Sequence, residues 1–316
     1  MKKMVGLLLA LFVCSSAFAA PFNQIVFFGD SLSDDGNLYQ ATKKTVPKSP
    51  PYYQGRFSNG PTWAEDLGKK YYDKYYIGTI NDSYGGATAI LHDPKTDSFT
   101  STITLEGELY SYSLHSMFVD KSKVLYVIWI GANDYLYEKT PDMSGVTDAV
   151  VNKIASSITS LINQGANQFL ILNLPDLAKT PYAQESGQRD RLHTFSEMHN
   201  QKLNDKMNEL KNQYPTIKLV TVSAYDILND LLANPEKYNQ QYNKSFKDMT
   251  QPCLTDESLL KNSSMNKANL SYTTGTITIC GNANEHVFWD IIHPTADVHE
   301  ILGAIVMQQL ANVGEG

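Results

Sequence analysis

The sequence has no run of basic residues. Its 26 lysine and arginine residues are outnumbered by 33 aspartate and glutamate residues, so the formal net charge is −7 at pH 7. Nucleic-acid phosphates are bound by clustered positive charge. We therefore expect no nucleic-acid partner.

Long apolar runs are also missing. The stretch Val5–Val13 is shorter than the roughly 20 residues that a membrane-spanning helix needs. Two lysines precede it, and Ala17-Phe18-Ala19 has the small–any–small pattern of a cleavage site. We predict that residues 1–19 are a signal peptide, with cleavage after Ala19 or Ala20. The protein would then be secreted, to the periplasm or beyond, with no transmembrane segment in the mature chain.

Cysteine is scarce, with three residues in the chain. Cleavage would remove Cys14 and leave Cys253 and Cys280 in an oxidising compartment, where we expect them to form a disulfide. The alternatives are two unpaired buried thiols or a metal site, and the long sequence separation disfavours the latter. A lipoprotein signal ending at Cys14 is an alternative for the N-terminus, but the bulky Val13 stands where a small residue is needed.

The remaining chain is long enough for one large domain. It has about 297 residues, no internal repeat and no extended low-complexity tract, and loss of the two N-terminal lysines lowers its net charge from −7 to −9. We predict a single domain over residues 20–316, with a disulfide-bounded loop segment near residues 253–280.

Strand and helix patterns alternate along this domain. Candidate strands are the apolar runs 25–28, 124–130, 169–172 and 217–222, the last interrupted by Lys218 and so placed nearer an edge. Candidate helices span 61–72, with Pro61 in the first turn, then 146–162, 189–213 and 295–312. This alternation predicts an α/β fold of three layers around a parallel sheet. The segment 234–285 is an exception, being polar with weak periodicity.

Polar sequences follow the first three candidate strands. They are Gly29-Asp30-Ser31, Gly131-Ala132-Asn133-Asp134 and Asn173-Leu174-Pro175-Asp176. Since the carboxyl ends of parallel strands share one edge of a sheet, and ligands bind there, we expect these side chains to surround a site.

Ser31 becomes a candidate nucleophile if a base lies near it. Among seven histidines, His293 stands out because Asp290 precedes it by three residues and Pro294 follows it. That spacing would let Asp290 hold the imidazole while the other ring nitrogen accepts a proton. The alternative is a helix start that Asp290 caps.

An oxyanion site also needs donors. Gly85-Gly86 could bring a backbone N–H close to a substrate, and Asn133 could supply a side-chain N–H₂ beside the Ser31 N–H. Each of these stretches alone is equally compatible with an ordinary turn.

Together, the motifs resemble a known family. Gly29-Asp30-Ser31-Leu32, Gly86, Gly131-x-Asn133-Asp134 and Asp290-x-x-His293-Pro294 occur in the order of the GDSL, or SGNH, hydrolases. The resemblance covers nearly all of the mature chain, and residues 55–63 are similar to the family's lipase-like branch.

The resemblance implies a role for each residue. Ser31 would be the nucleophile, His293 the general base and Asp290 the residue that orients it. Gly86 and Asn133 would complete the oxyanion hole with the Ser31 N–H. It also implies a three-layer, flavodoxin-like α/β/α sandwich around about five parallel strands, with no metal and no organic cofactor.

For the substrate, the resemblance implies a lipid ester. The chain is most similar to secreted lysophospholipases A, acting on lysophospholipid micelles or a membrane surface. A glycerophospholipid–cholesterol acyltransferase, a carbohydrate acetylesterase and a non-enzymatic surface-binding protein are the alternatives. We further expect the segment between Cys253 and Cys280 to act as a lid or substrate-selecting wall, and to be a site for an activating protease.

Overall fold

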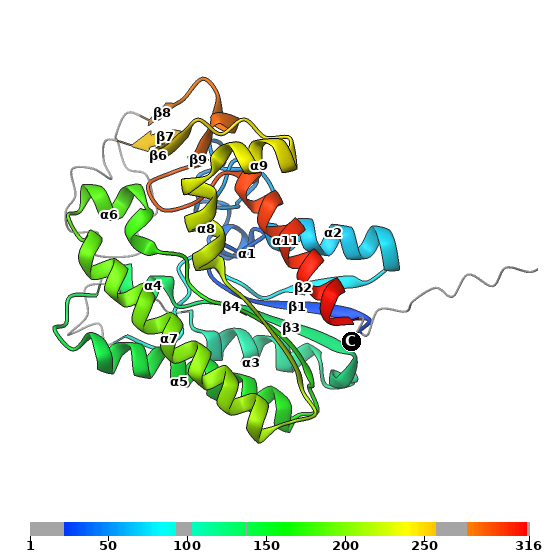
Figure 1. Cartoon of the computed structure of the whole chain (residues 1–316). Coiled ribbons are helices and arrows are strands. Elements are labelled where there is room, and N and C mark those ends of the chain that lie inside the picture. Colours follow the sequence, from blue (N-terminus) through cyan, green and yellow to red (C-terminus); the bar gives the residue numbers. More distant parts are fainter. Residues whose placement is uncertain (1–21, 93–102, 137, 257–276, 315–316) are drawn as a thin grey trace, which may run out of the picture.

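The computed structural model describes residues 22–92, 103–136, 138–256 and 277–314, so the predicted signal peptide lies outside the described residues. At its centre is a parallel sheet. Its strands are β1 (Gln24–Gly29), β2 (Gly78–Asn81), β3 (Val124–Trp129), β4 (Gln168–Leu172) and β5 (Lys218–Val222). They are arranged in the order β2-β1-β3-β4-β5 (Figure 1).

Four of these strands agree with the sequence prediction to within one or two residues. β5 lies at an edge of the sheet, and its Lys218 is exposed, as expected. β2, at the opposite edge, is not predicted from the sequence. Its Gly-Thr-Ile-Asn sequence contains one strongly apolar residue, and all four residues are exposed or half-buried.

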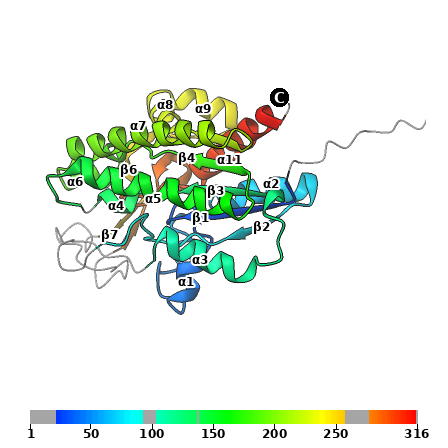
Figure 2. The same cartoon turned by 90° about the horizontal axis from the view of Figure 1, so that it is seen from below.

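The two faces of the sheet carry separate cores. Val26 and Phe28 of β1 pack on one face, and Ile25 and Phe27 on the other, because successive strand residues point to opposite sides. The first face is covered by α3 (Leu105–His115), α5 (Met143–Asn163) and α7 (Arg189–Gln213), and the second by α2 (Trp63–Tyr75) and α11 (Ala296–Gly314) (Figures 1 and 2). Burying each of these phenylalanine side chains contributes about 1.5–3 kcal/mol to the stability of the fold. The predicted three-layer α/β/α sandwich is confirmed.

Three predicted helix starts are corrected by the structure. α5 begins at Met143, three residues before the predicted start. α2 begins at Trp63 rather than at Pro61, because Thr62 is the N-cap and its backbone N–H donates to the Glu65 carboxylate at 2.9 Å. α11 begins at Ala296, one residue later than predicted, and its first N–H donates to the Asn59 side chain at 2.8 Å. The bounds of α7 match the prediction.

Shorter elements complete the fold. They are α1 (Asn37–Ala41), α4 (Ala132–Leu136), α6 (Pro181–Glu185), α8 (Ala224–Ala233), α9 (Pro235–Tyr242), β6 (Asp248–Pro252), β7 (Leu254–Asp256), β8 (Ile277–Ile279), β9 (His286–Phe288) and the 3₁₀ turns η1 (Lys121–Lys123), η2 (Leu177–Lys179) and η3 (Ala283–Glu285). The polar segment 234–285 is therefore more regular, where it is described, than its weak periodicity suggests. β6 pairs in parallel with β9, and β7 pairs antiparallel with β8.

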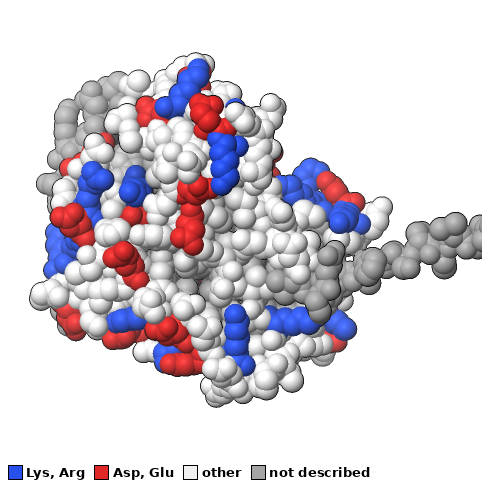
Figure 3. All heavy atoms as spheres, in the orientation of Figure 1, with Lys and Arg blue, Asp and Glu red and all other residues white. Residues whose placement is uncertain are grey.

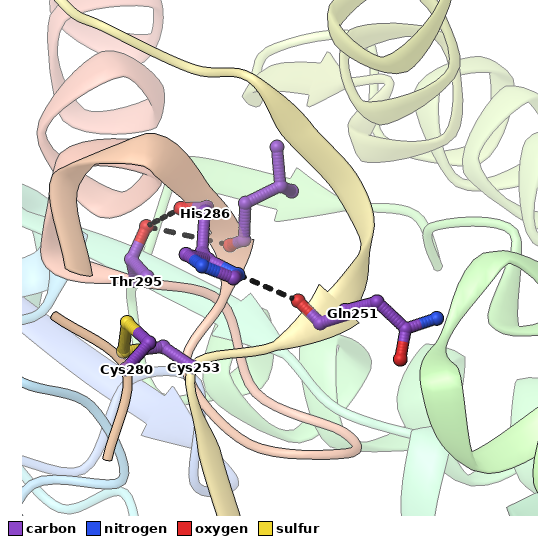
Figure 4. Close-up of a disulfide and its surroundings, with 6 residues drawn as sticks. Gln251, Cys253, Cys280, His286 and Thr295 are labelled. Carbon is purple, nitrogen blue, oxygen red and sulfur yellow. Dashed lines mark hydrogen bonds between the residues drawn. A yellow bond between two sulfur atoms is a disulfide. The ribbon is translucent and has the colours of Figure 1, made fainter. Parts of the chain in front are cut away.

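A disulfide joins Cys253 to Cys280, as expected, with 4.8 Å between the Cα atoms. Beside it, the ring Nδ1 of His286 lies 3.0 Å from the carbonyl oxygen of Gln251, and the Thr295 hydroxyl donates to the His286 carbonyl at 2.9 Å (Figure 4). These contacts fix β9, which leads directly into the segment that contains Asp290 and His293. Residues 257–276, which include most of the predicted lid, lie outside the described residues.

The described surface mixes acidic and basic side chains. Figure 3 shows both signs interspersed on one face of the molecule, with several close pairs. One such group is Lys244, whose ammonium lies 2.7 Å from the Asp297 carboxylate and also contacts Glu300. Across the residues that the structure describes, no helix is both long enough and apolar enough to cross a membrane.

Candidate active site

Ser31 lies in a tight turn directly after β1. Gly29 ends the strand, and a Cβ at this position would lie 2.4 Å from the Trp129 carbonyl oxygen, so only glycine fits beside β3. The Asp30 carbonyl accepts hydrogen bonds from the backbone N–H groups of Ser33 and Asp34, both at 3.0 Å. This turn buries Ser31 almost completely and holds its hydroxyl at the carboxyl edge of the sheet.

His293 and Asp290 lie at the same edge. Nε2 of His293 is 2.8 Å from the Ser31 hydroxyl, and its Nδ1 is 2.7 Å from Oδ2 of Asp290. Asp290 does not cap α11. Its Oδ1 instead accepts from the backbone N–H groups of Ile292 and His293, both at 2.7 Å. The structure therefore joins Ser31, His293 and Asp290 in a single hydrogen-bonded chain, from residues 262 positions apart in the sequence.

Tyr52 adds a fourth member that the sequence did not indicate. Its hydroxyl donates to Oδ2 of Asp290 at 2.6 Å, and its ring packs against Trp289 and Phe57. Burial alone would raise the pKa of Asp290, but the charge of His293 and the hydrogen bonds from His293 and Tyr52 outweigh burial and lower it. Since 238 positions separate Tyr52 from Asp290, no local pattern could reveal this contact.

Replacing Tyr52 with phenylalanine is expected to lower kcat about tenfold, because Asp290 loses one charge-assisted hydrogen bond. Without that donor the pKa of Asp290 rises, so the acid limb of the kcat/KM profile should move to higher pH. Tyr53→Phe is the matched control, since Tyr53 is adjacent and partly exposed, and contacts Arg56. A Tyr52→Phe enzyme with unchanged kcat and an unmoved acid limb would show that the hydroxyl is merely structural.

The predicted oxyanion residues Gly86 and Asn133 lie next to each other. Gly86 has φ +76°, in the left-handed region that favours glycine, and lies in the turn that Ala87 N–H closes onto the Tyr84 carbonyl at 3.0 Å. Asn133 donates its side-chain Nδ2 to the Ala87 carbonyl at 2.9 Å. The amide group of Asn133 is thus fixed next to the Gly86 turn.

Asp34 ties the Gly86 turn to the Ser31 turn. Its carboxylate accepts from the backbone N–H of Gly85 at 2.7 Å and from that of Gly36 at 2.7 Å. Among the described residues, no acceptor is hydrogen-bonded to the backbone N–H of Ser31 or of Gly86. These two backbone donors are therefore unpaired in the described structure, and Asn133 Nδ2 has a second N–H beyond the one that it donates to Ala87.

A mostly apolar cavity opens at Ser31. Ser31, Asn133 and His293 lie in its wall. Most of the rest of the wall is apolar and comes from α4, α8 and α11: Ala132, Leu136, Ala224, Ile227, Leu228, Leu231, Val298, Ile301 and Leu302, with Leu32, Trp129, Pro175, Leu177, Phe288, Ile292 and Pro294. Asp30, Thr180 and His299 are its other polar residues. An apolar group attached to a carbonyl at Ser31 could be buried in this cavity.

The family model of GDSL-like lipases and acylhydrolases matches residues 25–306. The chain belongs to this family. Membership makes it a carboxylic ester hydrolase, and the predicted resemblance is confirmed.

Individual GDSL relatives differ in their named activities. The chain is 30% identical to the phosphatidylcholine-sterol acyltransferase of Aeromonas hydrophila, over 93% of this chain and 92% of that protein. It is 26% identical to the secreted effector protein SseJ of Salmonella typhimurium, over 92% of this chain but only 64% of the effector. Est24, a carbohydrate acetylesterase from Sinorhizobium meliloti, has a solved structure with a TM-score of 0.49 and 15% identity, covering 92% of this chain and 99% of that one. A similarity of this size does not bear on the activity.

Two buried acids, one in the Ser31 turn and one in contact with Gly29 before it, lie at this GDSL enzyme's site. Glu108 accepts the Gly29 N–H at 2.9 Å, and burial raises its pKa well above the ordinary value. Burial also raises the pKa of Asp30 to about 7. Burial thus favours the protonated form of both acids, which limits negative charge near the position where an oxyanion would form. No pattern in the sequence pointed to Glu108.

Proposed function

We propose that this GDSL hydrolase is a secreted lysophospholipase A, which releases the fatty acid from a single-chain phospholipid. The apolar cavity beside Ser31 is the observation that carries the proposal. An acetyl group would leave almost all of this apolar wall without a partner. A long acyl chain would cover it, at about 0.8 kcal/mol for each buried CH₂ group.

In the proposed mechanism, the Ser31 hydroxyl attacks the ester carbonyl while His293 Nε2 takes its proton. Negative charge develops on the carbonyl oxygen and is stabilised by the backbone N–H groups of Ser31 and Gly86 and by the Asn133 amide. The alcohol leaves with the proton from His293. Water, activated by the same imidazole, then hydrolyses the acyl-enzyme and releases the fatty acid.

Hydrolysis of p-nitrophenyl esters of increasing chain length tests the proposal. Long chains should be preferred over acetate by at least about tenfold in kcat/KM, since each added methylene is buried. Leu228→Trp, which would fill the cavity from α8, should remove that preference and leave acetate hydrolysis unchanged. Leu232→Trp, one turn further along α8 and outside the cavity wall, is the matched control. A preference for acetate in the unmodified enzyme would support a carbohydrate acetylesterase instead.

Acyl transfer to a sterol is a second candidate, favoured by the similarity to the phosphatidylcholine-sterol acyltransferase of Aeromonas hydrophila. A transferase and a hydrolase share the same acyl-enzyme and differ in whether an alcohol or water accepts the acyl group. Product analysis with a diacyl phospholipid, a lysophospholipid and cholesterol present together separates them. A lysophospholipase A yields free fatty acid from the lysophospholipid, whereas a transferase yields cholesteryl ester.

Secretion is supported by the disulfide between Cys253 and Cys280, because such bonds persist in oxidising compartments. The lid and the activating protease remain predictions, since residues 257–276 lie outside the described structure. Cleavage under non-reducing conditions, followed by an esterase assay, would reveal whether a cut in this loop changes activity.

A further inference from the structure

A second histidine lies in the wall of the cavity. His299 is in the first turn of α11 and is only 2% exposed. Its sequence neighbours Val298, Ile301 and Leu302 line the same cavity, so its imidazole is a polar group in an apolar wall. The proposed mechanism assigns it no role.

The imidazole of His299 lacks a protein partner. Its Nδ1 is fully enclosed, and no residue that the structure describes is hydrogen-bonded to it. An unmade hydrogen bond of a buried polar group costs about 1–3 kcal/mol. The backbone N–H of His299 donates to the Thr295 carbonyl at 3.2 Å. No described residue is hydrogen-bonded to Nε2 either, and since Nδ1 is enclosed, Nε2 is the ring nitrogen that a molecule in the cavity could reach.

Burial, together with the charge of His293, lowers the pKa of His299 to about 3, so its ring is neutral at physiological pH. A neutral imidazole has one N–H donor and one acceptor nitrogen, and either tautomer can be adopted. A ligand carbonyl or ether could satisfy only an N–H. A hydroxyl both donates and accepts, so it can pair with Nε2 in either tautomer.

We infer that His299 is a specificity-determining residue that binds a hydroxyl group of the molecule occupying the cavity. The hydroxyl could belong to the acyl chain, as in a hydroxy fatty acyl ester. It could instead belong to the alcohol or water that accepts the acyl group. The inference rests on the proposed acyl-binding role of the cavity.

The test compares the unmodified enzyme with His299→Leu and His299→Gln. One arm measures the ratio of kcat/KM for 3-hydroxypalmitoyl and palmitoyl lysophosphatidylcholine. The other arm uses the palmitoyl substrate with added glycerol and measures the ratio of transfer to hydrolysis. His199→Leu is the matched control, because His199 is also fully buried with one unpaired nitrogen but lies outside the cavity wall.

His299→Leu should lower one of these ratios about fivefold, the size of one net hydrogen bond, and His299→Gln should restore part of the loss. A change in the first ratio places the hydroxyl on the acyl chain, and a change in the second places it on the acceptor. If His299→Leu changes neither ratio by more than about twofold, the inference is wrong.

A binding measurement separates this inference from the proposed function. Calorimetry on Ser31→Ala compares 3-hydroxypalmitic and palmitic acid, with and without His299→Leu, and requires no turnover. If the enzyme hydrolyses no long-chain ester, the proposed function is wrong. The His299 inference is then still supported if the hydroxy acid binds about fivefold more tightly and His299→Leu removes that preference. If both acids bind equally and neither kinetic ratio changes, the His299 inference is wrong and the proposed function is unaffected.

Discussion

Replacing Ser31 with alanine is expected to lower kcat for ester hydrolysis by at least about 10⁴-fold. The hydroxyl is the only group of this side chain that contacts His293, at 2.8 Å, and without it no acyl-enzyme can form. The backbone N–H of residue 31 and the other proposed oxyanion donors remain, so substrate should still bind with a similar affinity. Initial-rate kinetics with a long-chain p-nitrophenyl ester measure the loss.

Ser33→Ala is the matched control for Ser31→Ala. Ser33 lies two residues later in the same turn, and its buried hydroxyl accepts a hydrogen bond from Trp63 Nε1 at 3.1 Å. Its loss should cost about 1–3 kcal/mol of stability while leaving kcat within about tenfold. A Ser31→Ala protein that is folded by circular dichroism and retains full activity would rule out Ser31 as the nucleophile.

Replacing Asp290 with asparagine should lower kcat by about 10³- to 10⁴-fold. The carboxylate now accepts from the His293 ring, from Tyr52 and from two backbone N–H groups. An amide placed there presents an NH₂ group where one of these donors needs an acceptor. The imidazole would then be pushed toward the tautomer in which Nε2 carries the proton and cannot act as a base.

The same substitution changes how stability depends on pH. Because the folded-state pKa of Asp290 lies below its ordinary value of about 4, its ionisation stabilises the fold above that pH, and this contribution disappears as the pH falls through the folded-state pKa. Asp290→Asn should flatten this part of the acid unfolding curve. Asp297→Asn, a partly exposed change seven residues away, should affect neither kcat nor the acid limb of activity. An Asp290→Asn enzyme with nearly normal kcat would exclude an orienting role for Asp290.

The sheet and its main helices could be predicted because their signals are local. A continuous apolar run marks each buried strand, and one apolar helix face marks α5. The polar edge strand β2 and the strands β6 to β9 escape such reasoning, since their pairing depends on partners far along the chain. The start of α2 was misplaced because proline is compatible both with the first turn of a helix and with the position before the N-cap, which Pro61 occupies here.

The residues of the candidate active site likewise fall into those that the sequence indicates and those that only the structure reveals. Ser31, Asn133, Asp290 and His293 lie in recognisable motifs at strand or helix ends, so the sequence indicates them even though only the fold shows that they meet. Tyr52, Glu108 and His299 lie in no such motif. Tyr52 and Glu108 are noticed only through their contacts in three dimensions, with a carboxylate and with a strand end. His299 is noticed only because its ring is unpaired at an apolar cavity.

The most direct test of the central claim is to identify the residue that becomes covalently modified. Incubation with a fluorophosphonate that carries a long alkyl chain, followed by mass spectrometry of peptides, locates the nucleophile. The structure predicts one label per chain, on Ser31, and no label in Ser31→Ala or after prior occupation of the cavity by a fatty acid. A label on any other residue, or loss of esterase activity without a label on Ser31, would contradict the account.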